Sequence, residues 1–98
     1  MIFEATKREE MLGILNKKYP SLFTKNTEEF NPDFKGGIWT TGESGIYAKD
    51  GFKLFDYYAY NRQKKYELGV HNEIGNLLEK HGWYAEWYDC GTIMLWQI

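Results

Sequence analysis

The stretch that decides the fold is the end of the chain, GWYAEWYDCGTIMLWQI, Gly82 to Ile98. It predicts a hairpin of two strands, Trp83 to Tyr88 and Thr92 to Ile98, joined by Asp89-Cys90-Gly91. A three-residue loop with glycine last is typical of a type I turn followed by a left-handed residue and a bulge. Three of the four tryptophans lie in this stretch. Its side chains are large on both faces, which favours a sheet with helices on one face and aromatic groups on the other.

The composition indicates one small globular domain with more rings than its core can hold. Ninety-eight residues make a single domain, 1–98, and 18% of them are aromatic. Each buried ring removes on the order of 150 to 250 Å² from water, so some rings are expected at the surface, where grouped aromatics usually contact a partner. The net charge of -2 lacks the excess of cations that drives general binding to nucleic acid.

A first helix is expected from about Lys7 to Lys18. Thr6 and Glu9 have the spacing of a capping box, in which the hydroxyl accepts a hydrogen bond from the glutamate amide and the carboxylate reaches back. Pro20 ends the helix soon after. An apolar stripe runs along it, at Met11, Leu12, Ile14 and Leu15.

A second helix is expected after the polar break Asn61 to Lys65, and it ends at His81. Apolar residues recur at helical spacing, at Val70, Ile74, Leu77, Leu78 and His81. Gly82 follows as a left-handed C-terminal cap. Gly69 and Gly75 each disfavour a helix interior by about 1 kcal/mol relative to alanine, which indicates close packing or a late start of the helix.

Between the helices the sequence indicates a long connection and then a hairpin. The connection, Ser21 to Gly37, contains the turn signal Asn31-Pro32-Asp33 and is held down by isolated rings at Phe23, Phe30 and Phe34. A strand is expected over Ile38 to Thr41. Asp50-Gly51 then predicts a type I′ turn, which needs positive φ at both central residues.

A two-residue loop at Asp50-Gly51 would place Lys49 opposite Phe52 and Tyr47 opposite Leu54. Neither face of that hairpin is clearly polar. Together these elements predict an α+β fold, in the order α-β-β-β-α-β-β. The expected sheet is mostly antiparallel and five-stranded, with two helices on one face.

Few residues could form a metal-binding or catalytic site. His71 and His81 lie ten residues apart on one predicted helix, roughly 15 Å along its axis, and cannot share a metal ion. His81, Cys90 and Asp89 could meet at the corner between helix and hairpin, but a cysteine in a turn is more often without a chemical role. No cofactor or metal site is therefore expected.

Two further patterns could indicate a catalytic pair or a phosphate-binding loop. The carboxylates of Asp56, Glu86 and Asp89 could form an acid and base pair, although charges that protect strand edges explain them as well. The glycine-rich stretch Gly37 to Gly45 lacks the lysine of a phosphate-binding loop and precedes no helix, so it indicates a hairpin loop.

A mixture of rings and cations marks the centre of the chain. Such a mixture is typical of single-stranded nucleic-acid binding, in which bases stack on rings and cations hold phosphates, but also of protein interfaces. The near-neutral charge favours the protein interface. The candidate partner-binding residues are Tyr47, Tyr57, Tyr58, Tyr60, Arg62, Lys64, Lys65, Trp87 and Trp96.

The segment YELGVHNEIGNLLEKHGWYAEWYDCGTIMLWQI, Tyr66 to Ile98, resembles the ends of small uncharacterised proteins of tailed bacteriophages, marine ones in particular. The shared feature is Gly-Trp-Tyr-Ala-Glu-Trp-Tyr-Asp before a final strand. The resemblance covers a third of the chain, implies a viral or environmental origin, and brings no set of functional residues with it.

These patterns lead to one expected function and two alternatives. The expected function is that of a non-enzymatic interaction protein, a phage accessory factor that binds a host or viral protein and that also forms a homodimer through its surplus rings. The alternatives are a single-stranded nucleic-acid binder and a small enzyme that uses Cys90 or the carboxylates. With one cysteine and no run of apolar residues long enough for a membrane span, a cytoplasmic location without membrane contact is expected.

Overall fold

A computed structural model describes residues 4–42, 45–59 and 64–98, and it confirms an α+β fold with two helices and antiparallel sheets. The elements in chain order are α1 (Arg8–Lys18), β1 (Lys25–Asn26), the 3-10 turn η1 (Thr27–Glu29), β2 (Ile38–Thr41), β3 (Tyr66–Glu67), β4 (Val70–His71), α2 (Asn72–Lys80), β5 (Trp83–Asp89) and β6 (Thr92–Gln97).

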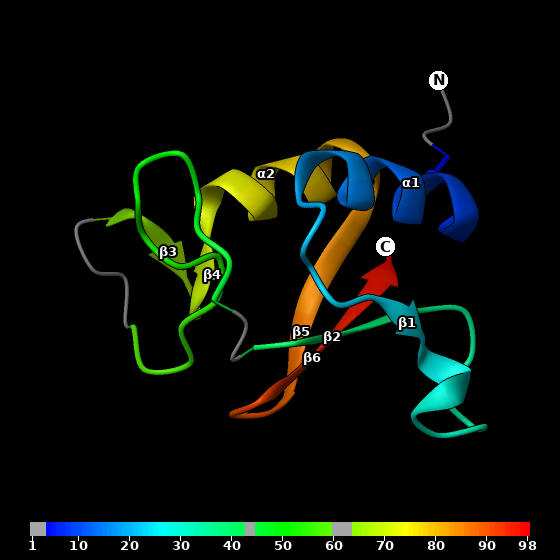
Figure 1. The fold of residues 1–98 in the computed structure, drawn as a ribbon. Helices are drawn as coiled ribbons and strands as arrows, with labels where there is room; N and C mark the ends of the chain where they lie inside the picture. The colour runs from blue at the N-terminus through cyan, green and yellow to red at the C-terminus, as the bar shows by residue number, and fades with distance from the viewer. Residues whose placement is uncertain (1–3, 43–44, 60–63) are drawn as a thin grey trace.

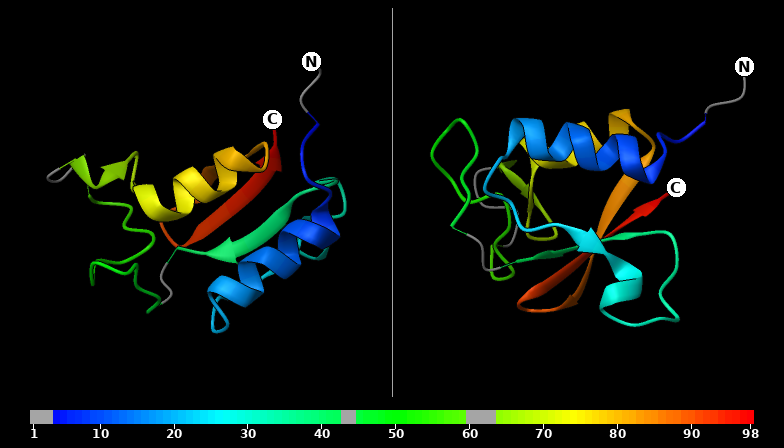
Figure 2. Two further views of the ribbon diagram at one scale, coloured as in Figure 1. Left: turned by 90° about the horizontal axis from the view of Figure 1, so that it is seen from above. Right: turned by 45° about the vertical axis from the view of Figure 1, so that its right-hand side comes forward.

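The strands form two separate sheets. The larger has four strands in the order β1-β2-β6-β5, all antiparallel, and the smaller pairs β3 with β4. Both helices lie over the same face of the larger sheet (Figures 1 and 2). The expected five-stranded sheet was wrong, because the stretch around Asp50-Gly51 supplies no strand to the larger sheet and only one bridge, Phe55 to Val70, to the smaller one, whereas β1 joins the larger sheet.

The core lies between the two helices and the larger sheet. Every second residue of β2, β5 and β6 points toward the helices, because side chains alternate between the faces of a strand. The buried core residues from the helices are Met11, Leu15, Ile74 and Leu78, and those from the sheet are Ile38, Trp83, Ile93 and Leu95. Leu77, expected on the apolar face of α2, is partly buried against this core.

Helix α1 begins one residue later than expected and without the capping box. Lys7 is its N-cap residue and forms no side-chain cap. The hydroxyl of Thr6 instead lies 2.9 Å from His81 Nδ1, and the Thr6 carbonyl accepts from Trp83 Nε1 at 2.6 Å. Thr6 therefore ties the start of the chain to the end of α2 instead of capping α1.

Helix α2 begins late, at Asn72, because the backbone before it is not helical. Leu68 and Gly69 both have positive φ, which lets β3 turn directly into β4. His71 is the N-cap, and its Nδ1 accepts the backbone N–H of Glu73 at 2.9 Å. Gly82, just beyond the helix, has φ +77°, which confirms the expected left-handed cap.

The turn at Asp50-Gly51 differs from the expected hairpin. Gly51 does have positive φ, +86°, but among described residues only Lys64 and Leu68 are non-glycine residues with positive φ, so Asp50 does not fit a type I′ turn. Tyr47 pairs with Lys53, not with Leu54, in a single isolated bridge. The loop is thus one residue longer than expected and its flanks form no strand.

The final hairpin is confirmed, with a different loop. Asp89 pairs with Thr92, so the loop is Cys90-Gly91, and the pairing register shifts between Trp87 and Asp89. Gly91 is not among the glycines with positive φ. The expected bulge therefore lies inside β5 and not at the last residue of the turn. Within the described ranges, no helix is long and apolar enough to cross a membrane.

Candidate interaction surfaces

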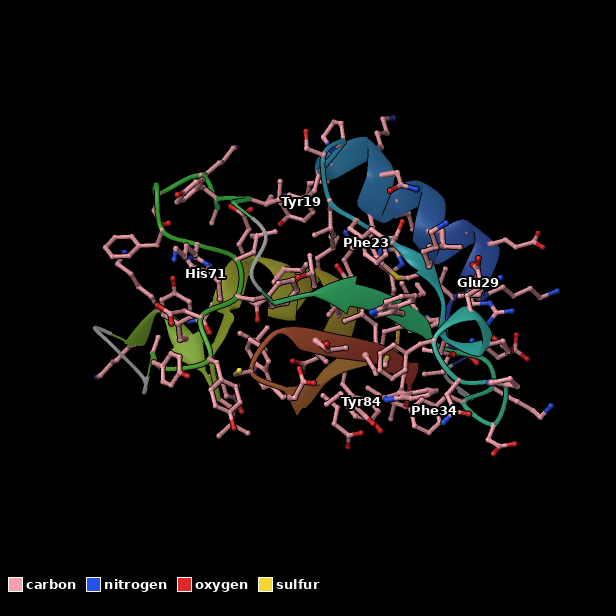
Figure 3. All side chains as sticks on the ribbon, turned by 60° about the horizontal axis from the view of Figure 1, so that its bottom comes forward. Tyr19, Phe23, Glu29, Phe34, His71 and Tyr84 are labelled. Atoms are coloured by element: carbon pink, nitrogen blue, oxygen red, sulfur yellow. The ribbon has the colours of Figure 1, made fainter. Side chains whose placement is uncertain are left out.

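The face of the larger sheet opposite the helices is covered by rings. Register places Lys25, Trp39, Met94 and Glu86 in one row across the four strands, and Tyr84 opposite Trp96 beside it. We call this surface the outer aromatic face, and its rings are Phe23, Phe30, Phe34, Trp39, Tyr84, Tyr88 and Trp96. In Figure 3, which brings this side of the molecule forward, Phe34 and Tyr84 are labelled on it, whereas His71 lies apart beside β4.

Contacts between rings join the strands across this face. The ring of Phe30 lies 5.0 Å from that of Trp39 on β2 and 4.9 Å from that of Tyr88 on β5, both edge-on. Phe30 therefore spans β6, where Met94 is only 2% exposed. Phe23 contacts Trp39 at 5.1 Å and Phe34 contacts both Phe30 and Tyr88, so these five rings form a continuous layer.

The layer is held at one end by the segment that contains η1. Glu28 accepts a hydrogen bond from the Gly36 amide at 3.0 Å and forms an ion pair with Arg8 at 2.6 Å. The Gly36 amide, with the Arg8 guanidinium as a further cause, lowers the pKa of Glu28 to about 2. Gly37 allows the strand to pass under Trp96, because a Cβ there would lie 2.6 Å from its ring. The expected turn at Asn31 is confirmed, since its side chain accepts from the Asp33 amide.

The outer aromatic face is only partly shielded from solvent. Phe23, Tyr84 and Tyr88 are 39, 43 and 53% exposed, and the other four rings are half-buried. Rings on an uncovered sheet face are typical of a surface that contacts another protein. The sequence did not identify most of these rings, because the alternation in WYAEWYD gives two aromatic faces and only the register with β6 shows which one the helices cover.

The structure separates the expected partner-binding residues. Trp96 lies on the outer aromatic face, but Trp87 lies on the inner face near the other end of β5. There the Trp87 indole donates to the Leu68 carbonyl at 2.7 Å and contacts Tyr57 at 5.1 Å. Trp87 and Trp96, both predicted as partner-binding residues, therefore point to opposite faces of the sheet.

The remaining expected residues belong to the central loops. Tyr47, Tyr57 and Tyr58 are exposed there, and none of them is part of the larger sheet. Tyr60 and Arg62 lie outside the described residues. Lys64 is exposed, whereas Lys65 forms an ion pair with Asp50 at 3.2 Å and lies over the Phe52 ring. The charge of Lys65 is thus already engaged within the chain.

A polar network joins the Asp50 loop to the start of α2. His71 is 6% exposed and its Nε2 lies 2.9 Å from Asp50 Oδ2. Since Nδ1 accepts the Glu73 amide, Nε2 carries the proton and donates it to Asp50. The backbone N–H of Phe52 above all, and then His71 and Lys65, lower the pKa of Asp50 to about 2.

Glu73 extends this network to α1. Its carboxylate accepts from the Lys49 amide at 3.0 Å and from the Tyr19 hydroxyl at 2.8 Å. Burial raises the pKa of Glu73, but these hydrogen bonds outweigh it and lower the pKa, whereas burial and the Glu73 carboxylate raise the pKa of Tyr19. Each group bonds to another part of the chain, so the network acts as a structural clamp between α1, α2 and the loop.

The geometry does not bring together the residues weighed for chemistry. His81 contacts Thr6 before β5, whereas Cys90 is exposed in the loop after it, so the whole length of β5 separates them. Asp56 and Asp89 each accept a backbone N–H two residues on, which stabilises a local turn. Among the described residues, no group of three His, Cys, Asp or Glu side chains could hold a metal ion.

Comparison with protein-family models, with curated proteins and with solved structures finds no match to this chain.

Proposed function

We propose that this chain is a non-enzymatic interaction protein that forms a homodimer through its outer aromatic face. The observation that carries the proposal is the layer of five contacting rings, with Tyr84 and Trp96 beside it, on the sheet face opposite α1 and α2. Its three most exposed rings leave on the order of 200 to 300 Å² in water. With the half-buried rings, the face reaches several hundred Å², the scale of one side of a specific interface.

The charges at the edges of this face support a second copy as the partner. In the row across the sheet, Lys25 lies on β1 at one edge and Glu86 on β5 at the other, with Trp39 and Met94 between them. A two-fold axis parallel to the strands places Lys25 of each copy opposite Glu86 of the other. An axis across the strands would instead place equal charges together.

The packing that results is a common one. Two sheets that meet face to face keep their strands aligned within about 30°, which a two-fold axis parallel to the strands allows. Lys25 has an ion-pair contact within its own chain, to Glu29 at 4.0 Å, but both side chains are about half exposed, so this contact contributes little.

The resemblance of Tyr66 to Ile98 to small phage proteins supports a role as a phage accessory factor. In that role the dimer would bind a host or viral protein. Pairing two copies of one small domain duplicates every other binding surface, which raises the avidity for a repeated or dimeric partner.

Sedimentation equilibrium tests the proposal. We expect a mass twice the 11.6 kDa of one chain at micromolar concentration. Tyr84→Lys should raise the dimer dissociation constant at least about tenfold, since it buries a charge among rings. Tyr47→Lys changes a ring of similar exposure outside the face and should leave the dimer intact. A monomer at millimolar concentration would refute the dimer.

A charge exchange tests the orientation of the axis. Lys25→Glu and Glu86→Lys should each weaken the dimer severalfold, because each creates two like-charge contacts at about 0.2 to 1 kcal/mol apiece. The double variant Lys25→Glu/Glu86→Lys should restore the affinity. A double variant weaker than both single variants would contradict the proposed axis.

A further inference from the structure

A groove runs beside β5, the last strand of the larger sheet. It encloses about 370 Å³ between α2 and the strand, and Leu68 in the turn from β3 to β4 and Ile98 are among the residues that line it. In Figure 1, α2 lies above β5. A space of this size is typical of a site that takes one or two side chains.

The backbone of β5 is open toward this groove. β6 pairs with one side of β5, and no strand in the described part of the chain pairs with the other. Ile98 donates its N–H to the Gly82 carbonyl, which places these two residues at a hydrogen-bonded position of the ladder, and such positions alternate from there along β5. The N–H and C=O groups of Ala85 and Trp87 therefore point away from β6, as in strands that accept an added strand.

The walls of the groove are apolar and built close together. Val70 and Leu78 line it from above, and Ala85 and Trp87 line it from the strand. Gly69 permits this closeness, because a Cβ there would lie 2.7 Å from the Asp56 carbonyl and 3.2 Å from the Trp87 ring. Leu68 is 85% exposed at the end of the groove, so an apolar side chain already stands in water where a ligand would cover it.

The charged side chains that line the groove are acidic. Glu67 and Glu79 line it, and none of its described lining residues is a lysine, arginine or histidine. Glu86 is exposed on the same edge strand. A segment that enters the groove is therefore favoured if it carries cations, since like charges across an interface oppose binding.

We propose that this groove binds an extended segment of a partner protein, which adds to the edge of β5 as a further strand. Every second side chain of the segment is apolar and enters the space under α2, and a lysine or arginine lies beside Glu67 and Glu79. The inference rests on the proposed function in that both require a protein partner. It uses a different surface, and it holds whether or not the outer aromatic face forms a dimer.

A blocked groove provides the first test. Peptides are selected from a random linear library against the chain, and the binding of a selected peptide is measured by fluorescence anisotropy. Gly75 lines the groove, and a Cβ there meets only Val70 Cγ1 at 3.8 Å, an ordinary van der Waals contact, so Gly75→Leu adds a side chain to the groove. We expect it to weaken binding at least about tenfold. Gly13→Leu is the matched control, since Gly13 lies on α1 with nothing within 4 Å of its Cβ, and it should bind as the wild type does.

Two changes in the probe test strand addition and charge. The peptide amides form two alternating sets, and only one set bonds to β5 when the peptide adds as a strand. Methylation of that set should abolish binding, whereas methylation of the other set should not. Glu67→Lys with Glu79→Lys should weaken a selected peptide that carries lysine or arginine. A library that yields no binder, or a binder that tolerates Gly75→Leu or methylation of both sets, would overturn the inference.

The failures of the two proposals are distinguishable. If Tyr84→Lys abolishes peptide binding and Gly75→Leu does not, the peptide binds the outer aromatic face. That result overturns the proposal for the groove and supports the outer aromatic face as the interaction surface. If Gly75→Leu abolishes both peptide binding and the dimer, β5 pairs with a second copy, which overturns the partner segment as occupant. Peptide binding to a monomer leaves the groove standing and refutes only the dimer.

Discussion

Two turns of this chain reverse its direction, at 48–52 and at 89–92, yet only the second lies within a sheet. In the first, Gly51 has the left-handed φ of +86°, the Ala48 amide donates to the Phe52 carbonyl, and one bridge follows. In the second, Gly91 has no such φ, and the two strands beyond it pair along their whole length. A favourable turn residue therefore does not decide whether strands form beside it.

What decides it is the surroundings of the flanking residues. β6 lies between β2 and β5, so both of its edges are paired, and Ile93 and Leu95 are fully buried against the helices. The flanks of the Asp50 loop pair with β4 over a short distance only, through the bridge of Phe55 to Val70 and the two backbone hydrogen bonds beside it. Side chains also hold that loop, through the bonds of Asp50 to His71 and of the Lys49 amide to Glu73.

Trp83→Ala should cause the largest loss of stability, because Trp83 anchors the final hairpin. Trp83 is 1% exposed at the start of β5, and its indole holds the Thr6 carbonyl. Its loss leaves a large cavity and removes one of the two side-chain hydrogen bonds to that carbonyl, which Gln97 Nε2 also donates to. We therefore expect a loss of about 3 to 5 kcal/mol in the free energy of unfolding, measured by urea denaturation. Trp83→Phe keeps most of the burial and should cost clearly less. Equal losses for the two variants would show that packing of the indole contributes little.

The contrast between the two turns also shows what the sequence can predict. The left-handed Gly82 was predicted correctly because a helix cap depends on neighbours in the chain, and the final hairpin and Ile38 to Thr41 because their residue types favour strands. The bounds of α2 were not, since the turn at Leu68 and Gly69 depends on Asp56 and Trp87, which are distant in sequence.

The candidate site was harder to predict than the fold. That rings cover the second face of the sheet follows from their number and from alternation. Which rings they are does not, because Trp87 and Trp96 differ only by the register of β5 against β6. No local sequence pattern predicts the groove beside β5, because its walls come from four separate elements.

Gly51→Val tests the loop that side chains hold. A β-branched residue at φ +86° is strained although nothing crowds its Cβ, so we expect a loss of about 1 to 3 kcal/mol in thermal or urea unfolding. Gly45→Val is the matched control, a loop glycine with equally open space and no left-handed φ, and it should change stability little. If both variants unfold at the wild-type midpoint, the positive φ at Gly51 is not required.

The smallest effect is a dependence of the loop on pH. Hydrogen bonds, above all from the Phe52 amide, hold the pKa of Asp50 at about 2 in the folded chain, below its ordinary value of 3.8. A depressed folded pKa stabilises the fold above the ordinary value, and the contribution is lost as the pH falls from there through about 2. Glu28 has a similarly low pKa, so the wild type alone would not isolate Asp50.

Asp50→Asn therefore serves as the reference, because it keeps Glu28 and removes only the titrating carboxylate of the loop. The difference in unfolding free energy between wild type and Asp50→Asn should be constant near neutral pH and should shrink as the pH falls from about 4 to about 2. Amide exchange should show the loss in the Asp50 loop before it appears in β5 and β6, since backbone pairing and not a carboxylate holds those strands. A difference that stays constant down to pH 2 would mean that the Asp50 charge does not hold the loop, and the contrast between the two turns would then need another cause.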